Sequence, residues 1–325
     1  MPRKRRITDP GALLPRLPAS GSVDPGRMRH HGRTGGVVMA EEAKAKVGLG
    51  GVPETLLVTL YHRAAEARRP DALLHDPKAV ELVDGIDYPF ERHFGTPGLG
   101  RGQGQALRVR CFDQAVERFL ATHPGGTVVA LGEGLETQFW RVDNGQVRWL
   151  TVDLPETLEV RRRLLPAEPR VRTLACSALD ERWMDEVDTS RGVLLTAQGL
   201  LMYLQPAEVH RLVAACAQQF PGGALLFDGV PRWLSTRTMR GMKMSEHYQV
   251  PPMPWALDAA EQRRLRSHSN IVELRELRPP RGRGVFNGTL MPLVTRLPLV
   301  GGRIPPLLLW RIMLARFGTS TTKPG

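Results

Sequence analysis

The sequence is poor in cysteine, which limits how the protein can be held together. Its 325 residues include three cysteines, Cys111, Cys176 and Cys216, an odd number without the paired spacing of metal ligands. A disulfide framework and a structural zinc site are therefore not expected. A reducing, cytoplasmic compartment is expected instead.

Long apolar runs are also missing. The run near the C-terminus, residues 304–314, is interrupted by Pro305, Pro306 and Arg311. It is also shorter than the roughly 20 residues that a membrane-spanning helix needs. No apolar segment follows the basic residues at the N-terminus, so they do not indicate a secretory signal. The sequence thus predicts no transmembrane segment.

Acidic residues are scarce at both ends of the chain, and the net charge of +12 is concentrated there. Residues 1–38 hold eight Arg or Lys against two acids, and residues 278–325 hold eight against none, which leaves residues 39–277 with a net charge of −2. A near-neutral body offers no basic groove, so no nucleic-acid partner is expected. Residues 1–38 also lack an apolar period and predict a disordered basic extension.

Between these ends, short apolar runs alternate with helical patterns. Helices are predicted within 52–84, 106–122, 156–165 and 206–220, with a glycine-rich loop over 95–104. Strands are predicted at 127–131, 147–152, 171–174, 192–196 and 224–227, and two more at 271–277 and 290–297. The alternation predicts an α/β fold with an open, mostly parallel sheet and helices on both faces.

A glycine loop follows the first of these strands. Gly132 and Gly134 come directly after the apolar run, and Asp153 ends the next strand 19 residues after Gly134. This spacing is typical of a Rossmann-like sheet in which the acid binds a ribose. Glu133 and Glu136 flank the glycines, and carboxylates there disfavour a pyrophosphate. The loop therefore favours S-adenosylmethionine, a cationic donor without phosphate, and Glu133 is included among the candidate cofactor-binding residues.

Seven segments within residues 54–300 resemble, in consistent order, the leucine carboxyl methyltransferase family, and within it the bacterial polyketide O-methyltransferases. They are LVTLYHRAAEARRPDALLHDPKAVELV, ALRVRCFDQAVERFL, VVALGEGLETQFWRVD, VDLPETLEVRRRLL, SALDERWMD, AQGLLMYLQPAEV and VPPMPWAL. The resemblance implies a class I methyltransferase that uses S-adenosyl-L-methionine.

The resemblance also implies roles for individual residues. Arg63 and Arg108 match basic residues at the donor's carboxylate, and Gln198 sits where the family usually has a glutamate near the donor's amino group. The remaining matches are Gly132 and Gly134 at the methionine part, Asp153 at the ribose, and Ala178 and Leu179 at the adenine.

Three positions depart from the family pattern. The usual G-x-G-L-D-T-R loop here has Glu136 and Gln138 in place of its aspartate and arginine, and the usual E-G-L-L-M-Y-L begins with Gln198. A neutral amide accepts a hydrogen bond from an ammonium without charge assistance. These departures suggest weaker donor binding and leave open a non-catalytic donor-binding module.

On the acceptor side, Tyr203 and His247 are the candidate catalytic residues, because either could orient or deprotonate an acceptor oxygen. Methionines and tryptophans in 231–268 predict an adaptable apolar lid over the acceptor. Residues 303–325 predict a basic C-terminal helix and tail, which either docks on the body or contacts an anionic membrane surface. We expect docking.

The expected organisation is therefore an N-terminal helical cap (39–125), a Rossmann-like donor-binding core (126–230), the lid, the end of the sheet (269–302) and the C-terminal helix. The expected activity is O-methylation of a hydroxyl or carboxyl oxygen on an apolar, polyketide-like small molecule. A protein C-terminal carboxyl methyltransferase is the alternative within the family.

Overall fold

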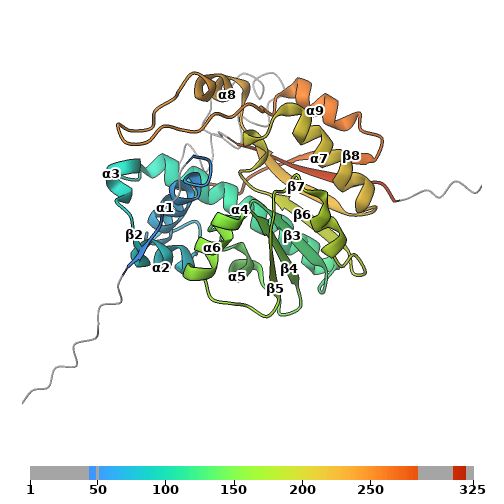
Figure 1. Cartoon of the computed structure of the whole chain (residues 1–325), viewed down its shortest axis with the longest axis horizontal. Helices are drawn as coiled ribbons and strands as arrows, with labels where there is room; N and C mark the ends of the chain where they lie inside the picture. The colour runs from blue at the N-terminus through green and yellow to red at the C-terminus, as the bar shows by residue number, and fades with distance from the viewer. Residues whose placement is uncertain (1–43, 49–50, 285–309, 320–325) are drawn as a thin grey trace, which may run out of the picture. The chain divides into compact units, whose positions relative to one another are not determined.

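The structure is a computed structural model that describes residues 44–48, 51–284 and 310–319. The predictions for 1–38 and for a strand at 290–297 lie outside these residues. Within them, a seven-stranded sheet forms the centre (Figure 1). Its order is β5 (Val171–Ala175), β4 (Arg148–Asp153), β3 (Thr127–Leu131), β6 (Val193–Ala197), β7 (Ala224–Gly229), β9 (Arg311–Phe317) and β8 (Ile271–Leu277). The five strands from β5 to β7 are parallel, as predicted, and β9 runs antiparallel to both of its neighbours.

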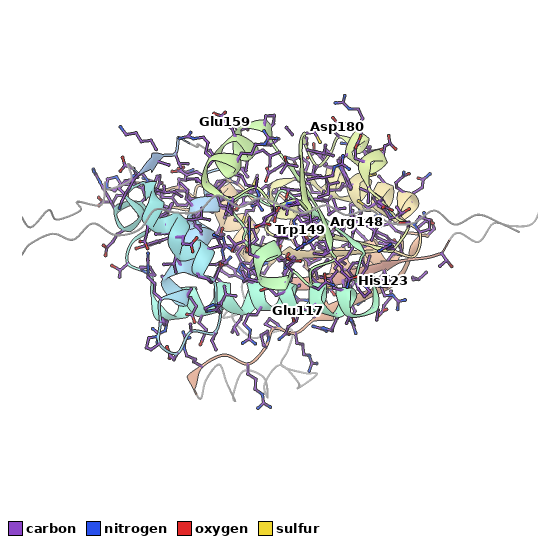
Figure 2. All side chains as sticks on the ribbon, turned by 90° about the horizontal axis from the view of Figure 1, so that it is seen from below. Glu117, His123, Arg148, Trp149, Glu159 and Asp180 are labelled. Carbon is purple, nitrogen blue, oxygen red and sulfur yellow. The ribbon has the colours of Figure 1, made fainter. Side chains whose placement is uncertain are left out.

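Helices cover both faces of the sheet because its central strands are apolar on both sides. Along β3, Val128 and Ala130 pack with α4 (Leu99–Thr122) and α5 (Gln138–Val142). Val129 and Leu131 face the opposite core, which contains α7 (Pro206–Gln219), α9 (Ala259–Arg266) and the 3-10 helix η1 (Glu181–Glu186). Trp149 of β4, labelled in Figure 2, packs on the side of α4 and α5 and is 2% exposed.

The N-terminal part is helical, as predicted. The pattern over 52–84 divides into α1 (Thr55–Ala67) and α2 (Pro77–Gly85). The division falls where Asp76 accepts a hydrogen bond from the backbone of Ala79 at 3.1 Å and Pro77 opens the second helix. The short strands β1 (Ala45–Lys46) and β2 (Ile86–Asp87) pair in parallel, and α3 (Phe90–Phe94) follows them.

The predicted glycine-rich loop at 95–104 is largely helical, because α4 already begins at Leu99. Glycine is a poor helix former, but α4 packs along α1, and Gln103 and Gln105 are buried there. Gln103 also accepts a hydrogen bond from the backbone of Arg283 at 2.8 Å. Tertiary contacts therefore extend the helix beyond what local propensity indicates.

The predicted C-terminal helix is wrong for Arg311–Phe317, which form the strand β9. Strand β9 lies between β7 and β8 and pairs with both, and Ile312, Met313, Ala315 and Phe317 are buried on its two faces. A strand enclosed on both faces has nearly continuous apolar residues, so the same sequence also fits one face of a helix. These residues are part of the sheet and not a membrane-surface helix.

The segment after β7 contains α8 (Arg232–Met239) and a loop closed by a bridge between Lys243 and Gln249. Its buried residues pack against α1, α2 and α3. None of the helices in the described part of the chain has the length and apolarity that crossing a bilayer requires.

Candidate active site

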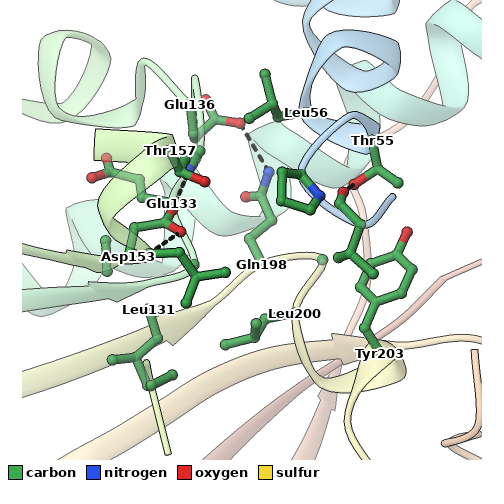
Figure 3. A pocket seen from close by; sticks show the side chains of 18 of the residues that line it. Thr55, Leu56, Leu131, Glu133, Glu136, Asp153, Thr157, Gln198, Leu200 and Tyr203 are labelled. Atoms are coloured by element: carbon green, nitrogen blue, oxygen red, sulfur yellow. Dashed lines mark hydrogen bonds between the residues drawn. The ribbon is translucent and has the colours of Figure 1, made fainter. Parts of the chain in front are cut away.

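A cavity of about 310 Å³ lies at the carboxyl ends of β3, β4 and β6 (Figure 3). Strand β3 is the point where the strand order reverses, since β4 and β5 lie on one side of it and β6 and β7 on the other. Ligands of open α/β sheets bind at such switch points. Further walls come from residues 52–59 around the start of α1, the 3-10 helix η2 (Leu201–Tyr203), Arg108 and Trp310.

The glycine loop lines the cavity and adopts the backbone that its sequence predicts. Gly132 and Gly134 have φ angles of +61° and +57°, a region that favours glycine. A Cβ atom on Gly132 would also lie 2.9 Å from the side chain of Leu200. Asp153 Oδ2 accepts a hydrogen bond from Gly134 N at 2.7 Å, and Oδ1 accepts one from Leu154 N at 2.8 Å. The carboxylate that was predicted to bind ribose therefore also holds the loop in place, and it lines the cavity.

Two buried polar atoms among the lining residues have no hydrogen-bond partner in the described structure. One is Nη2 of Arg108, whose Nε donates to Asp228 at 2.5 Å. The other is Oε1 of Gln198, whose Nε2 donates to Glu136 Oε2 at 3.0 Å. Burying an unsatisfied polar atom is costly. This donor and this acceptor leave room for a ligand that offers one hydrogen-bond acceptor and one hydrogen-bond donor.

Arg63 does not line the cavity. It is 1% exposed and lies behind the glycine loop, where it donates to Asp76 at 3.1 Å, to the backbone of Leu135 at 2.7 Å and to Glu136. Its charge is thus engaged within the protein. The structure places it as a support of Glu136 and not beside a donor's carboxylate.

Glu133 likewise turns its carboxylate to protein groups. Arg161 lies 3.1 Å away, Trp149 donates to Oε1 at 3.2 Å, and Thr151 donates to Oε2. Burial raises the pKa of Glu133, and Arg161 opposes this effect. The negative charge that the sequence suggested for the donor's surroundings is therefore paired at this position.

Glu136 differs from Glu133 because it carries a low pKa. Burial alone would raise the pKa, but Arg63 and Arg141 outweigh it and lower it to about 2. Glu136 lines the cavity, and Figure 3 shows its contact with Gln198. The family usually has a glutamate where this chain has the neutral Gln198. Here a negative charge is present instead on Glu136, which accepts a hydrogen bond from Gln198.

Of the two residues predicted to border the adenine, Ala178 lines the cavity and Leu179 does not. Cys176, Ser177 and Ala178 after β5 line the cavity, together with Leu154 and Thr157. Leu179 is not among the lining residues and packs against the core instead.

Tyr203 lines the cavity, as predicted, near Thr55. Burial raises its pKa to about 12, against a smaller opposing effect of a hydrogen bond with Thr55. The phenol is therefore protonated at neutral pH and is suited to donating a hydrogen bond rather than to removing a proton.

His247 lies outside the cavity. It is exposed, accepts a hydrogen bond from Arg92 Nε at 3.4 Å and stacks on His93 with 5.9 Å between ring centroids. A general base must reach the proton that it removes, so the structure offers His247 no such role.

The lid predicted over 231–268 contributes no lining residue among those described. Met253 and Trp255 are buried, and Trp255 donates to Glu261 at 2.8 Å. The tryptophan that lines the cavity is instead Trp310, and the Arg108 guanidinium lies over its ring, 4.3 Å from the ring centroid. Sequence reasoning also missed Asp228, although its place at the end of an apolar strand was a signal for it.

Comparisons with known proteins agree with this geometry. Residues 56–217 match the family model of leucine carboxyl methyltransferases. The chain is 37% identical over 202 residues to the tetracenomycin polyketide synthesis O-methyltransferase TcmP of Streptomyces glaucescens, a match that covers 62% of this chain and 72% of TcmP. The chain belongs to the leucine carboxyl methyltransferase family.

Two further relatives are consistent with this membership. The methyltransferase is 31% identical over 205 residues to the S-adenosyl-L-methionine-dependent methyltransferase dpfgK of Gibberella zeae, covering 57% of this chain and 68% of dpfgK. A protein from Thermobifida fusca, whose crystal structure is described as that of a methyltransferase, is 20% identical in sequence to this chain. It has a TM-score of 0.50 and covers 79% of this chain and 94% of that one. This second likeness supports the Rossmann-like fold.

The enzyme is thus an S-adenosyl-L-methionine-dependent methyltransferase. The cavity fits that donor, because its methionine part carries one carboxylate and one ammonium. The unpartnered Nη2 of Arg108 and Oε1 of Gln198 offer one donor and one acceptor for these two groups.

Proposed function

We propose that this methyltransferase transfers the methyl group to a hydroxyl or carboxyl oxygen of an apolar, polyketide-like small molecule. The observation that carries the proposal is the apolar wall beside the polar donor groups, formed by Leu56, Met202, Leu204 and Trp310. Such a wall suits a flat, apolar acceptor. The names of TcmP, an O-methyltransferase, and of the family, carboxyl methyltransferases, support an oxygen as the methylated atom.

The donor-binding residues follow from the same cavity. We assign Arg108 to the carboxylate and Gln198 to the ammonium, and Asp153 to the ribose. Gly132 and Gly134 allow close approach of the backbone, and Ala178 borders the adenine. Arg63 supports Glu136 from behind the glycine loop, and Glu133 lines the cavity with its carboxylate paired to Arg161. Leu179 packs against the core and receives no donor contact in this assignment.

When bound, S-adenosyl-L-methionine supplies a methyl group on a positively charged sulfur, open to in-line attack by an oxygen. The protein's task is to orient the acceptor oxygen and to exclude water from it. Tyr203 is protonated and can donate a hydrogen bond that fixes the acceptor. Trp310 and Leu56 line the same space with apolar surface.

The lining residues that the structure describes offer no base that titrates near neutral pH on the acceptor side. No histidine is among them, and the pKa of Tyr203 is raised to about 12. We therefore propose that the acceptor is already an anion when it binds, as a carboxylate or an acidic phenol is.

The test is donor-dependent methylation of a panel of carboxylic acids, acidic phenols and weakly acidic phenols, with a peptide ending in leucine for the protein-substrate alternative. Product mass and fragmentation identify the methylated atom. We expect O-methyl products from the ionised small molecules, and a rate that rises through the pKa of each acceptor. Methylation confined to nitrogen, carbon or the peptide would overturn the proposal.

We also propose a cytoplasmic location, supported by the three free cysteines. Residues 39–125 and 126–230 are proposed as the helical cap and the donor-binding core. For the acceptor we now assign Trp310 and the lining residues of the segment 52–59, which are Val52, Pro53, Thr55, Leu56 and Thr59. The described residues of 231–268 do not line the cavity.

A further inference from the structure

The buried cluster behind the glycine loop contains more carboxylates than arginines. Arg141 lies 2.9 Å from Asp76, 2.8 Å from Asp113 and 2.8 Å from Glu136, and Arg63 contacts Asp76 and Glu136. Each of these five side chains is at most 11% exposed. The described cluster thus has three carboxylates, two guanidinium groups and one negative charge in excess. A buried excess charge is costly unless a partner of opposite sign joins it.

The excess charge is held on the side of the cluster that borders the cavity. Burial raises the pKa of Asp113, against the opposing effect of Arg141. The pKa of Glu136 is lowered to about 2 despite its burial, so Glu136 stays ionised. Glu136 also lines the cavity.

Gln198 connects this charge to the ligand space. A carboxylate can only accept hydrogen bonds, so the amide nitrogen of Gln198 must face Glu136, at 3.0 Å. Its Oε1 is therefore left as the free end, and it is buried without a partner among the described residues. The other carboxylates that line the cavity are engaged elsewhere, Glu133 with Arg161 and Asp153 with the backbone of Gly134 and Leu154. Asp228, which does not line the cavity, pairs with Arg108.

We propose that Glu136 and Gln198 together form the ammonium site for the donor, in which Gln198 accepts the hydrogen bond and Glu136 supplies the negative charge. The proposal rests on the proposed donor-binding function. Glu136 acts through Gln198 and is a positioning residue. The chain thereby places its anion one side chain farther from the ligand than a glutamate at position 198 would.

The test compares two ligands by calorimetry, S-adenosylhomocysteine and its deaminated analogue, which lacks the ammonium. The wild-type enzyme is expected to prefer S-adenosylhomocysteine. Glu136→Gln is expected to lower the affinity for S-adenosylhomocysteine on the order of tenfold, the effect of losing one weak charge interaction. The affinity for the deaminated analogue is expected to stay nearly unchanged. Equal weakening of both ligands would mean a structural role for Glu136 and would overturn the proposal.

Two variants guard against a folding defect in Glu136→Gln. Gln198→Leu removes the acceptor atom without breaking an ion pair, and is expected to abolish the preference in the same way. The swap Glu136→Gln with Gln198→Glu keeps the net charge and moves the carboxylate to the ligand, and is expected to restore the preference. A swap variant that folds but shows no preference contradicts the proposal.

Asp113→Asn is the matched control. It removes a carboxylate from the same cluster, but from the side bonded to Gln138 and Arg141 rather than to Gln198. It is expected to change both affinities by a similar factor. If the folded wild-type enzyme binds neither ligand, the proposed function itself fails. If the enzyme binds both but Glu136→Gln leaves their ratio unchanged, only the ammonium site fails.

Discussion

Arg108 and Asp228 form a buried ion pair in which Nε donates to Oδ2 at 2.5 Å, with side chains 3% and 0% exposed. Asp228 also accepts a hydrogen bond from Gly199 N at 2.8 Å. A Cβ atom on Gly199, whose φ is +75°, would lie 2.8 Å from Nη2 of Arg108. The Asp228 carboxylate at the end of β7 therefore holds in place both the Arg108 side chain and the loop after β6. Nη2 of Arg108 lies buried beside Gly199, which lines the cavity, and has no hydrogen-bond partner among the described residues.

Arg108→Lys should separate donor binding from folding. Lysine keeps a positive charge for Asp228, but its single ammonium cannot also reproduce the Nη2 group. We expect the affinity for S-adenosylhomocysteine to fall about 10- to 100-fold, in line with the roughly 1.5–3 kcal/mol of a hydrogen bond to a charged group. Calorimetry measures the affinity, and urea denaturation should show a much smaller change in the free energy of unfolding. Arg110→Lys, on the same helix but outside the cavity, should leave the affinity unchanged.

Tyr203→Phe should lower kcat without changing the shape of its pH profile. With a pKa of about 12, the phenol stays protonated between pH 6 and pH 10 and acts only as a hydrogen-bond donor. We expect a loss on the order of tenfold, the effect of about one hydrogen bond. Steady-state rates across this pH range provide the measurement. If the substitution removed a limb of the profile, Tyr203 would instead be a titrating base.

Glu136 should make the stability of the enzyme depend on acid pH. Its pKa falls from 4.5 to about 2 on folding, so its contribution is present above about pH 4.5 and is lost as the pH falls toward 2. The difference in unfolding free energy between wild type and Glu136→Gln should therefore be largest above pH 5 and shrink on acidification. Denaturant titrations from pH 2.5 to pH 7 test this, with Glu159→Gln as the control, because Glu159 is exposed on α6 (Pro155–Leu164). A difference that does not vary with pH would contradict the expectation.

Truncation at the C-terminus should report on β9. A chain that ends at residue 302 lacks the strand between β7 and β8 and exposes the edge of β7. We expect it to lose cooperative unfolding and to aggregate, because an open apolar edge pairs with other chains. A chain that ends at residue 319 keeps β9 and should melt like the full-length protein. Circular dichroism and light scattering distinguish the two, and a cooperatively folded short chain would show that β9 is dispensable.

Local sequence determined the five parallel strands of the sheet and the glycine loop. Runs such as Thr127–Leu131 are apolar at successive positions because β3 is buried on both faces, so the strand is visible without its neighbours. Gly132 and Gly134 have the positive φ angles that a tight turn requires, and Asp153 follows from its place at the end of β4. Each of these features depends on residues near one another in the chain.

Only the tertiary structure decided the C-terminal strand and the groups around the cavity. The pattern of Arg311–Phe317 suits a helix face or a buried strand equally, and the place between β7 and β8 selects the strand. The low pKa of Glu136 depends on Arg63, 73 residues earlier in the chain. Trp310 reaches the cavity, whereas His247 does not. Charge pairing and burial depend on which distant segments fold side by side, and no local periodicity encodes that.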